Sequence, residues 1–206
     1  EDAVKFYEQK LEVIEFNDYE KEVNFDFSAV EDLVNQDLSY LHFFHDTGVI
    51  HLGGKNITDE SFMFFEVLLN LRVLTFDDTK IKGEGVKYLS KLTKLERFIA
   101  NNTPFTDKGL EYLSKIKFEK LIEVQLTNTK ITDEGLKYLS KIKLTGALYL
   151  ANTKITDEGL KYLSNQKDLA EIDLRGTKVT KAGAQWLEKQ LPNTGIEYGK
   201  YVPQRD

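Results

Sequence analysis

The chain has 206 residues, of which 41% are hydrophobic and 30% are charged, a balance typical of one folded domain with a sizeable core. Its 34 acidic residues outnumber its 28 basic ones, and the resulting net charge of -6 argues against nucleic acid as a partner. The absence of cysteine excludes a disulfide framework, a thiolate zinc site and a cysteine nucleophile. No apolar run approaches the roughly 18 residues that a membrane helix needs, so we expect no membrane span.

Residues 1–46 do not repeat, and we expect them to form an N-terminal cap of mixed α and β structure that is integral to the rest of the fold. Apolar residues within 3–11 are spaced as in a short amphipathic helix. Alternation at 13–16 and 23–27 predicts a hairpin whose second strand joins the main sheet. The apolar spacing within 28–46 suits a further helix, although residues 42–45 do not clearly continue it.

An internal repeat occupies residues 47–192, which we divide into about six coils of 24 residues. It is marked by threonines at successive spacings of 24, 26, 24 and 24 residues: Thr79, Thr103, Thr129, Thr153 and Thr177. Before each threonine, apolar residues at every second position predict a short strand. After it, the spacing changes to three, as in Leu136, Leu139 and Ile142, which predicts a helix. Each coil therefore contains one strand and one helix.

The start of each helix carries several local signals. Thr132 is placed to cap the helix N-terminus, Asp133 adds negative charge there, and a glycine follows at Gly135. We expect the glycine to permit close approach between neighbouring helices. We expect the repeated threonine, where the chain leaves each strand, to bond its hydroxyl to backbone groups of an adjacent coil. Two departures, Lys82-Gly83 and Lys181-Ala182, predict weaker helix starts.

The repeat, L-x-x-L-x-L-x-x-T-x-I-T-D-x-G-L-x-x-L, resembles bacterial leucine-rich-repeat proteins related to the cysteine-containing subclass, with threonine in place of cysteine. The resemblance covers roughly residues 47–192, and the ten residues at 131–140 return unchanged at 155–164. It implies an α/β fold, a right-handed solenoid with parallel strands on the concave face and helices on the convex face. It implies no catalytic residues, and it implies export to the periplasm, the cell envelope or the outside of the cell.

Residues 193–206 are expected to form a C-terminal cap or tail. The residues at 191–195 match the letters of a sortase anchor, but the apolar span and basic tail of such a signal do not follow. We interpret them as the exit turn of the last coil, with proline ending its helix.

The strand positions between the apolar residues face the concave side, because side chains alternate across a strand. Their mixture of apolar, aromatic and charged groups is typical of a protein interface. We therefore predict a non-enzymatic, monomeric module that binds a protein or peptide without a cofactor. A structural spacer or envelope component, whose strand residues merely tolerate water, is an alternative. The predicted contact residues are Arg97, Ile99, Glu123, Gln125, Tyr149, Asp173 and Arg175.

Three histidines, His42, His45 and His51, lie within ten residues of each other, with Asp46 beside them. Imidazoles with a carboxylate can bind zinc, so a metal site or a metal-dependent activity is a second functional hypothesis. Their spacing matches no zinc motif, and cap histidines bonded to backbone or water are the simpler interpretation.

An aromatic column at the repeat spacing runs along the predicted helices. Such a row can bind sugars or a partner, but its regular spacing favours packing between adjacent coils. Its members are Phe64, Tyr88, Tyr112, Tyr138, Tyr162 and Trp186.

Overall fold

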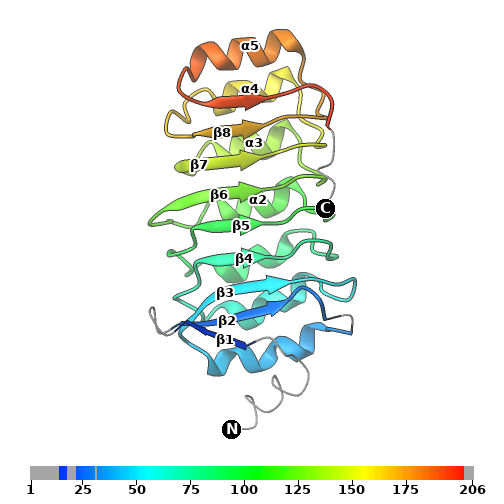
Figure 1. The fold of residues 1–206 in the computed structure, drawn as a ribbon, viewed down its shortest axis with the longest axis vertical. Coiled ribbons are helices and arrows are strands. Elements are labelled where there is room, and N and C mark those ends of the chain that lie inside the picture. The colour runs from blue at the N-terminus through cyan, green and yellow to red at the C-terminus, as the bar shows by residue number, and fades with distance from the viewer. Residues whose placement is uncertain (1–13, 18–21, 31, 202–206) are drawn as a thin grey trace.

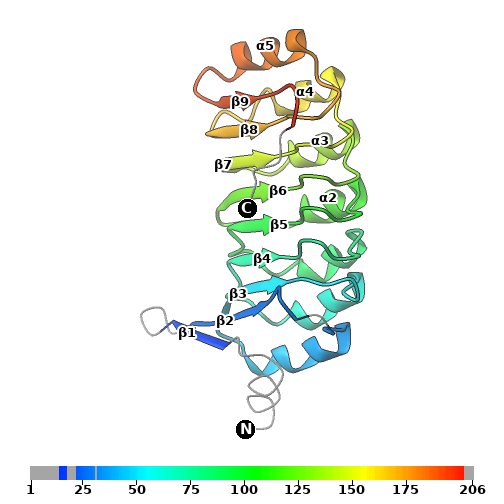
Figure 2. The same ribbon diagram turned by 45° about the vertical axis from the view of Figure 1, so that its right-hand side comes forward.

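The computed structural model describes residues 14–17, 22–30 and 32–201, and the helix predicted at 3–11 lies outside them. Nine strands form one open sheet in chain order (Figure 1). The first pair is antiparallel, and every later neighbour is parallel. Helices line one side of this sheet and leave the other side open (Figure 2). The predicted solenoid of parallel strands and helices is therefore confirmed.

Most strands are short, as the repeat predicts. The strands are β1 (Ile14–Asn17), β2 (Glu22–Phe27), β3 (Thr47–Leu52), β4 (Val73–Thr75), β5 (Arg97–Ile99), β6 (Leu121–Gln125), β7 (Leu144–Tyr149), β8 (Glu171–Asp173) and β9 (Gly195–Glu197). Among the described residues, three 3-10 helices come first, η1 (Asn35–Phe43), η2 (Asp59–Phe65) and η3 (Glu84–Leu89). Four α-helices follow, α2 (Asp107–Leu113), α3 (Asp133–Leu139), α4 (Asp157–Leu163) and α5 (Lys181–Gln190). Within the described residues, no helix has the length and apolar character to cross a bilayer.

The two ends of the sheet extend beyond the predicted repeat. β2 pairs with β1 in a hairpin and with β3 in parallel, as expected for the second strand of the cap. At the other end, β9 lies in the segment predicted as a tail and pairs with β8. The division into cap, repeats and tail at 46/47 and 192/193 stays a prediction.

The parallel strands pair in a register that aligns equivalent positions of each coil. Leu74 lies beside Phe98, Phe98 beside Val124, and so on along a fully buried row. The positions on either side of this row point away from the helices, because side chains alternate along a strand. The core beneath contains edge-to-face phenylalanines in the first coils, with ring centroids of Phe76 and Phe98 separated by 5.1 Å. Leucine and isoleucine replace them in the later coils.

Consecutive coils are joined on the helix side by the aspartate at the first position of α2, α3 and α4. The Asp107 carboxylate accepts hydrogen bonds from the backbone N–H of Thr132 at 2.9 Å and from its hydroxyl at 2.6 Å. Asp133 makes the same two contacts with Thr156, at 2.8 and 2.7 Å. Each aspartate thus satisfies the N-terminus of the next helix, where unpaired donors and positive potential favour an anion.

The repeated glycine makes room for this aspartate. A Cβ atom on Gly135 would lie 2.4 Å from Oδ1 of Asp107, and one on Gly159 would lie 2.3 Å from Oδ1 of Asp133. At Gly135 and Gly159, close approach between neighbouring helices is therefore the reason for the glycine, as expected, and the approaching group is the carboxylate at the start of the preceding helix. At Gly109 the nearest atoms are instead those of the Phe105 ring in the same coil.

The repeated threonine after each strand bonds within its own coil, so the expected bond to an adjacent coil is wrong. Thr129, for example, donates its hydroxyl to the carbonyl of Leu126 at 2.6 Å. Asn128, between them, has a φ of 58°, which turns the chain sharply. This turn brings the carbonyl three residues back within reach of the hydroxyl.

The two departures from the repeat differ in how the helix N-terminus is satisfied. At Lys82-Gly83 the 3-10 helix η3 follows, and Gly83 offers no side-chain cap, but Asp59 accepts from the N–H groups of Lys82, Gly83 and Gly85. The weaker start there stays a prediction. At Lys181-Ala182 the first turn of α5 carries no acidic residue, and the weaker start stays a prediction, but the helix N-terminus is capped. Thr180 caps α5 by accepting from Gly183 N–H at 3.1 Å, and Asp157 accepts two bonds from Thr180. The cap comes from neighbours of the substituted residues, which the local substitution does not remove.

Candidate interaction surface

The concave face is formed by the strand positions that point away from the helices, together with the residues immediately after each strand. All seven predicted contact residues lie on this face, because the strands that carry them pair in register. Their role in binding stays a prediction. They come from β5, β6, β7, β8 and the residue two positions after β8: Arg97, Ile99, Glu123, Gln125, Tyr149, Asp173 and Arg175.

The centre of the concave face is a polar network across adjacent strands. Arg97 forms a salt bridge with Glu123 at 3.4 Å, and the amide of Gln125 donates to the same carboxylate. The Gln125 carbonyl oxygen accepts from the side-chain amide of Asn101 at 2.8 Å. These contacts hold the side chains in fixed positions, which lowers the entropy lost when a partner binds.

Tyr149 gives this centre an aromatic surface. Its side chain is half-buried, and its hydroxyl donates to Glu171 at 3.3 Å. Burial, followed by the negative charges of Glu171 and other carboxylates, raises the pKa of Tyr149 above its ordinary value. The ring therefore lies in a negative potential, and a half-buried aromatic side chain of this kind is a favoured anchor in protein interfaces.

At the C-terminal end of the face, Asp173 is buried and holds Arg175 in position. Its side chain is 4% exposed, and its Oδ1 accepts from both the backbone N–H and Nε of Arg175 at 2.9 Å. The guanidinium also contacts Oδ2 of Asp173 at 2.8 Å and Glu197 at 3.0 Å. The hydrogen bond that the Arg175 guanidinium donates to Asp173 outweighs burial and raises the pKa of Arg175. Asp173 thus orients Arg175 and has little surface of its own to offer a partner.

A hollow of about 320 Å³ lies at the N-terminal end of the face, between β2, β3 and β4. Asp26 lines it and accepts two bonds from Ser28, which hold the pKa of Asp26 below its ordinary value although burial raises it. Asp77 lines the other side, and burial raises its pKa despite the bond it accepts from Asn101 N–H at 2.6 Å. Between them, Thr75 Oγ1 is buried and has no hydrogen-bond partner among the described residues.

The predicted contact set omitted these two aspartates. Asp26 lies on a strand of the predicted cap, whereas Asp77 follows a strand of the repeat. Their proximity depends on β2 joining the sheet beside β3. Extending the alternating positions of the repeat into residues 23–27 would have placed Asp26 on the concave face.

The three histidines do not form one site. His42 is exposed on η1, where its ring lies 3.9 Å from that of Phe43 and one ring nitrogen contacts the Ser39 carbonyl. His45 is exposed beyond η1, and His51 lies on the concave face beside Asp26. Among the residues that the structure describes, no group of three or more His, Cys, Asp or Glu side chains could hold a metal ion. The metal hypothesis therefore gains no support.

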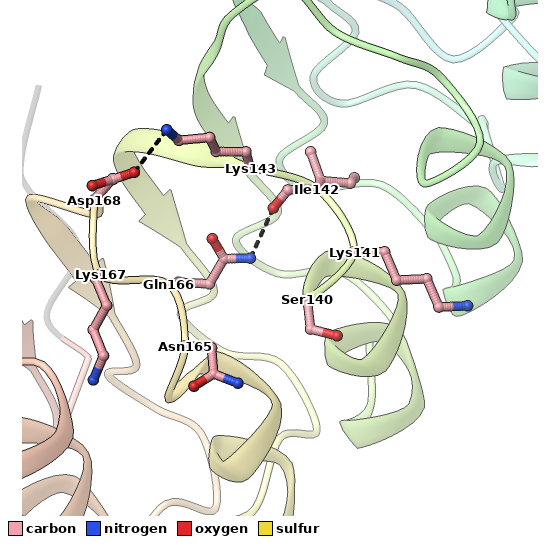
Figure 3. A pocket seen from close by; sticks show the side chains of 8 residues that line it. All are labelled: Ser140, Lys141, Ile142, Lys143, Asn165, Gln166, Lys167 and Asp168. Atoms are coloured by element: carbon pink, nitrogen blue, oxygen red, sulfur yellow. Dashed lines mark hydrogen bonds and ion pairs between the residues drawn. The ribbon is translucent and has the colours of Figure 1, made fainter.

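A second hollow, of about 330 Å³, lies between the turns that follow α3 and α4 (Figure 3). Gln166 occupies the buried position that Ile142 has one coil earlier, and its amide donates to the Ile142 carbonyl at 2.8 Å. Its side-chain oxygen accepts from Leu144 N–H at 3.5 Å, where β7 begins. Lys143 and Asp168 form a 3.0 Å salt bridge beside it. The glutamine thus satisfies backbone groups where the coil departs from the regular spacing, which is a structural role.

The aromatic column on the helix side packs between coils, as its spacing favours. Five of its six members are partly buried against the core, and lysines lie over several of their rings, such as Lys161 over Tyr162 at 5.4 Å. Trp186 at the end of the column is 41% exposed. Packing of this kind accounts for the column without a ligand.

A protein-family model described as "Leucine Rich repeat" matches residues 119–140 and 147–164. No curated protein matches the chain. Among solved structures, internalin C2 of Listeria monocytogenes is 18% identical, with a TM-score of 0.56, over 84% of this chain and 69% of its own. A plant ice-binding protein is 14% identical, with a TM-score of 0.58, over 86% of this chain and 71% of its own.

A leucine-rich-repeat protein of Leptospira interrogans is 17% identical over 77% of this chain, with a TM-score of 0.53, and this chain covers only 45% of it. Identities this low concern the fold alone. The family model and these structures together show a leucine-rich-repeat solenoid. Relation to the cysteine-containing subclass stays a prediction.

Proposed function

We propose that this protein is a non-enzymatic interaction module that binds a protein or peptide on its concave face. Leucine-rich-repeat solenoids commonly serve as such modules, and their extended sheets offer large binding surfaces. The face spans about 25 Å between β3 and β8, from a spacing of about 4.8 Å between strands. This length suits an extended peptide or a loop of a folded partner.

The two sides of the sheet differ in how their exposed residues vary between coils. Exposed positions on the helix side repeat between coils, so that the exposed Lys137 and Lys161 follow the same Asp-Glu-Gly-Leu sequence. On the concave face, most equivalent positions differ between coils, as with Ile99, Gln125 and Tyr149, although Val49 recurs as Val73 and Glu123 recurs as Glu171. The fold requires neither set, because neither belongs to the buried core. The individual character of the concave positions is what recognition of a particular partner requires.

The direct test is affinity capture from extracts of the source organism with the double variant Arg97→Ala/Tyr149→Ala. Both side chains lie on the concave face, and neither holds a buried charge in place. Arg175 is left intact, because its removal would leave the buried carboxylate of Asp173 unpaired and destabilise the fold. The matched control is Lys137→Ala/Lys161→Ala on the helix side.

A partner captured by the wild type and the control, but lost with Arg97→Ala/Tyr149→Ala at an unchanged melting temperature, supports the proposal. Equal capture by all three proteins contradicts it and favours the structural spacer. We also expect the protein itself to be a monomer, which light scattering measures. A stable dimer that covers β5 to β7 would make the concave face an interface between copies.

A further inference from the structure

Negative charge is concentrated on the concave face. From β2 to β9, among the side chains that the structure describes, the outward strand positions and the second residue after each strand carry six carboxylates and two guanidinium groups. Their net charge is -4, within a chain total of -6. The carboxylates belong to Asp26, Asp77, Glu123, Glu171, Asp173 and Glu197. The guanidinium groups belong to Arg97 and Arg175.

The two arginines do not balance this charge evenly. Arg97 pairs with Glu123 at 3.4 Å, and Arg175 pairs with Asp173 at 2.8 Å and Glu197 at 3.0 Å. The other three carboxylates, those of Asp26, Asp77 and Glu171, form no salt bridge with any described residue. They accept hydrogen bonds only from uncharged groups. Within the described part of the chain, these three carboxylates therefore have no lysine or arginine partner.

These three carboxylates lie at two places. Asp26 and Asp77 border the hollow at the N-terminal end of the face, and Glu171 lies beside Tyr149 near the other end. Of the residues that the structure describes, no lysine or arginine lines the hollow. Four strand intervals separate β4 from β8, or about 19 Å. A small cation cannot bridge that distance, whereas about six residues of extended chain can.

We propose that the concave face binds an extended segment of a partner protein that carries lysine or arginine side chains at two places, one reaching Asp26 and Asp77, the other reaching Glu171. This inference rests on the proposed function. At the second place, the cation also meets the Tyr149 ring, where attraction to the ring adds to the charge pairing. Burial raises the pKa of Asp77, so its charge is poorly stabilised in the free protein and gains from an incoming cation.

The test is fluorescence anisotropy with two labelled ten-residue peptides, one alternating Lys and Ser and the other alternating Glu and Ser. The binding variant is Asp77→Asn/Glu171→Gln, which removes two charges while both new amides keep an oxygen that accepts the existing hydrogen bonds. The matched control, Glu84→Gln/Glu188→Gln, removes two charges from exposed helix positions. Melting temperatures establish that all three proteins are folded.

The lysine peptide should bind the wild type at about 50 mM salt and bind Asp77→Asn/Glu171→Gln about tenfold more weakly. The control should differ from the wild type by less than about twofold. The glutamate peptide should not bind. If both double variants bound the lysine peptide equally weakly, the effect would come from net charge alone, and the inference would be overturned. Absence of binding by the lysine peptide to the wild type would overturn it too.

The captured partner distinguishes failure of this inference from failure of the proposed function. A partner lost with Arg97→Ala/Tyr149→Ala but retained by Asp77→Asn/Glu171→Gln would mean that the face binds a segment without the predicted cations. A partner retained by both variants would mean that the concave face is not the binding surface.

Discussion

Aspartates occur on both sides of the sheet and have different partners. On the helix side, Asp107 and Asp133 each accept two hydrogen bonds from the threonine that caps the next helix. On the concave face, Asp77 accepts one backbone hydrogen bond, and no lysine or arginine pairs with it among the described residues. The same side chain therefore joins coils in one place and stays available for a partner in the other.

This difference separates the residues that the solenoid needs from those that it tolerates. A carboxylate at a helix N-terminus is stabilised by unpaired N–H groups and by the helix dipole, so it contributes to folding. A half-buried carboxylate without a cation costs free energy in the unbound protein. Substitutions on the helix side should therefore lower the free energy of unfolding more than substitution of a concave-face carboxylate.

Gly159→Val should have the largest effect, a loss of about 3 kcal/mol in the free energy of unfolding. The new Cβ would lie 2.3 Å from Oδ1 of Asp133, whose position is fixed by its bonds to Thr156. Urea unfolding measures this loss. The control Lys161→Val, at an exposed position of the same helix, should lose less than about 1 kcal/mol. Equal losses would mean that space for Asp133 is not the reason for the glycine.

Asp133→Ala should lower the free energy of unfolding by about 2 kcal/mol, because the Thr156 N–H and hydroxyl both lose a charged acceptor. The comparison is Asp168→Ala, which removes an exposed carboxylate paired with Lys143 and should cost less than about 1 kcal/mol. Similar values for the two variants, again from urea unfolding, would contradict the joining role of the aspartate.

Thr129→Val should cost about 1 kcal/mol, because the buried hydroxyl donates one uncharged hydrogen bond to the Leu126 carbonyl. Valine keeps the shape of the side chain, so the loss reports the hydrogen bond. A melting curve unchanged from that of the wild type would show that the repeated threonine is retained for a reason other than this bond.

Asp77→Asn should leave stability unchanged or slightly higher at neutral pH. Burial raises the pKa of Asp77 in the folded protein, so its ionisation opposes folding and stability falls as pH rises through that pKa. The difference between variant and wild type should vanish below the ordinary value of 3.8, where Asp77 is protonated in both folded and unfolded states. Melting temperatures between pH 3 and pH 7 measure this, and a clear loss at neutral pH would make Asp77 structural.

The sequence predicts the coil, because strand alternation and helical spacing are local patterns that repeat five times. The contact between Asp107 and Gly135 links neighbouring coils, so the spacing could suggest close approach without identifying the carboxylate. The threonine hydroxyl was assigned to the wrong coil because the positive φ of Asn128 is not evident from the repeat.

Only part of the candidate surface was predicted, because some of its features depend on contacts that the repeat pattern does not specify. Alternation is enough to place Tyr149 and Arg97 on the concave face, since it depends only on their own strands. The burial of Asp173 beneath Arg175 depends on side-chain conformation, which alternation does not specify. The hollow between Asp26 and Asp77 depends on how the cap joins the sheet, and no repeat pattern covers that junction.

The most direct test of concave-face binding is the dissociation constant of the captured partner for the wild type, Arg97→Ala/Tyr149→Ala and the helix-side control Lys137→Ala/Lys161→Ala. We predict a loss of about 100-fold for the concave variant, from two contacts of about 1.4 kcal/mol each, and less than about twofold for the control. Equal dissociation constants for all three proteins would contradict concave-face binding.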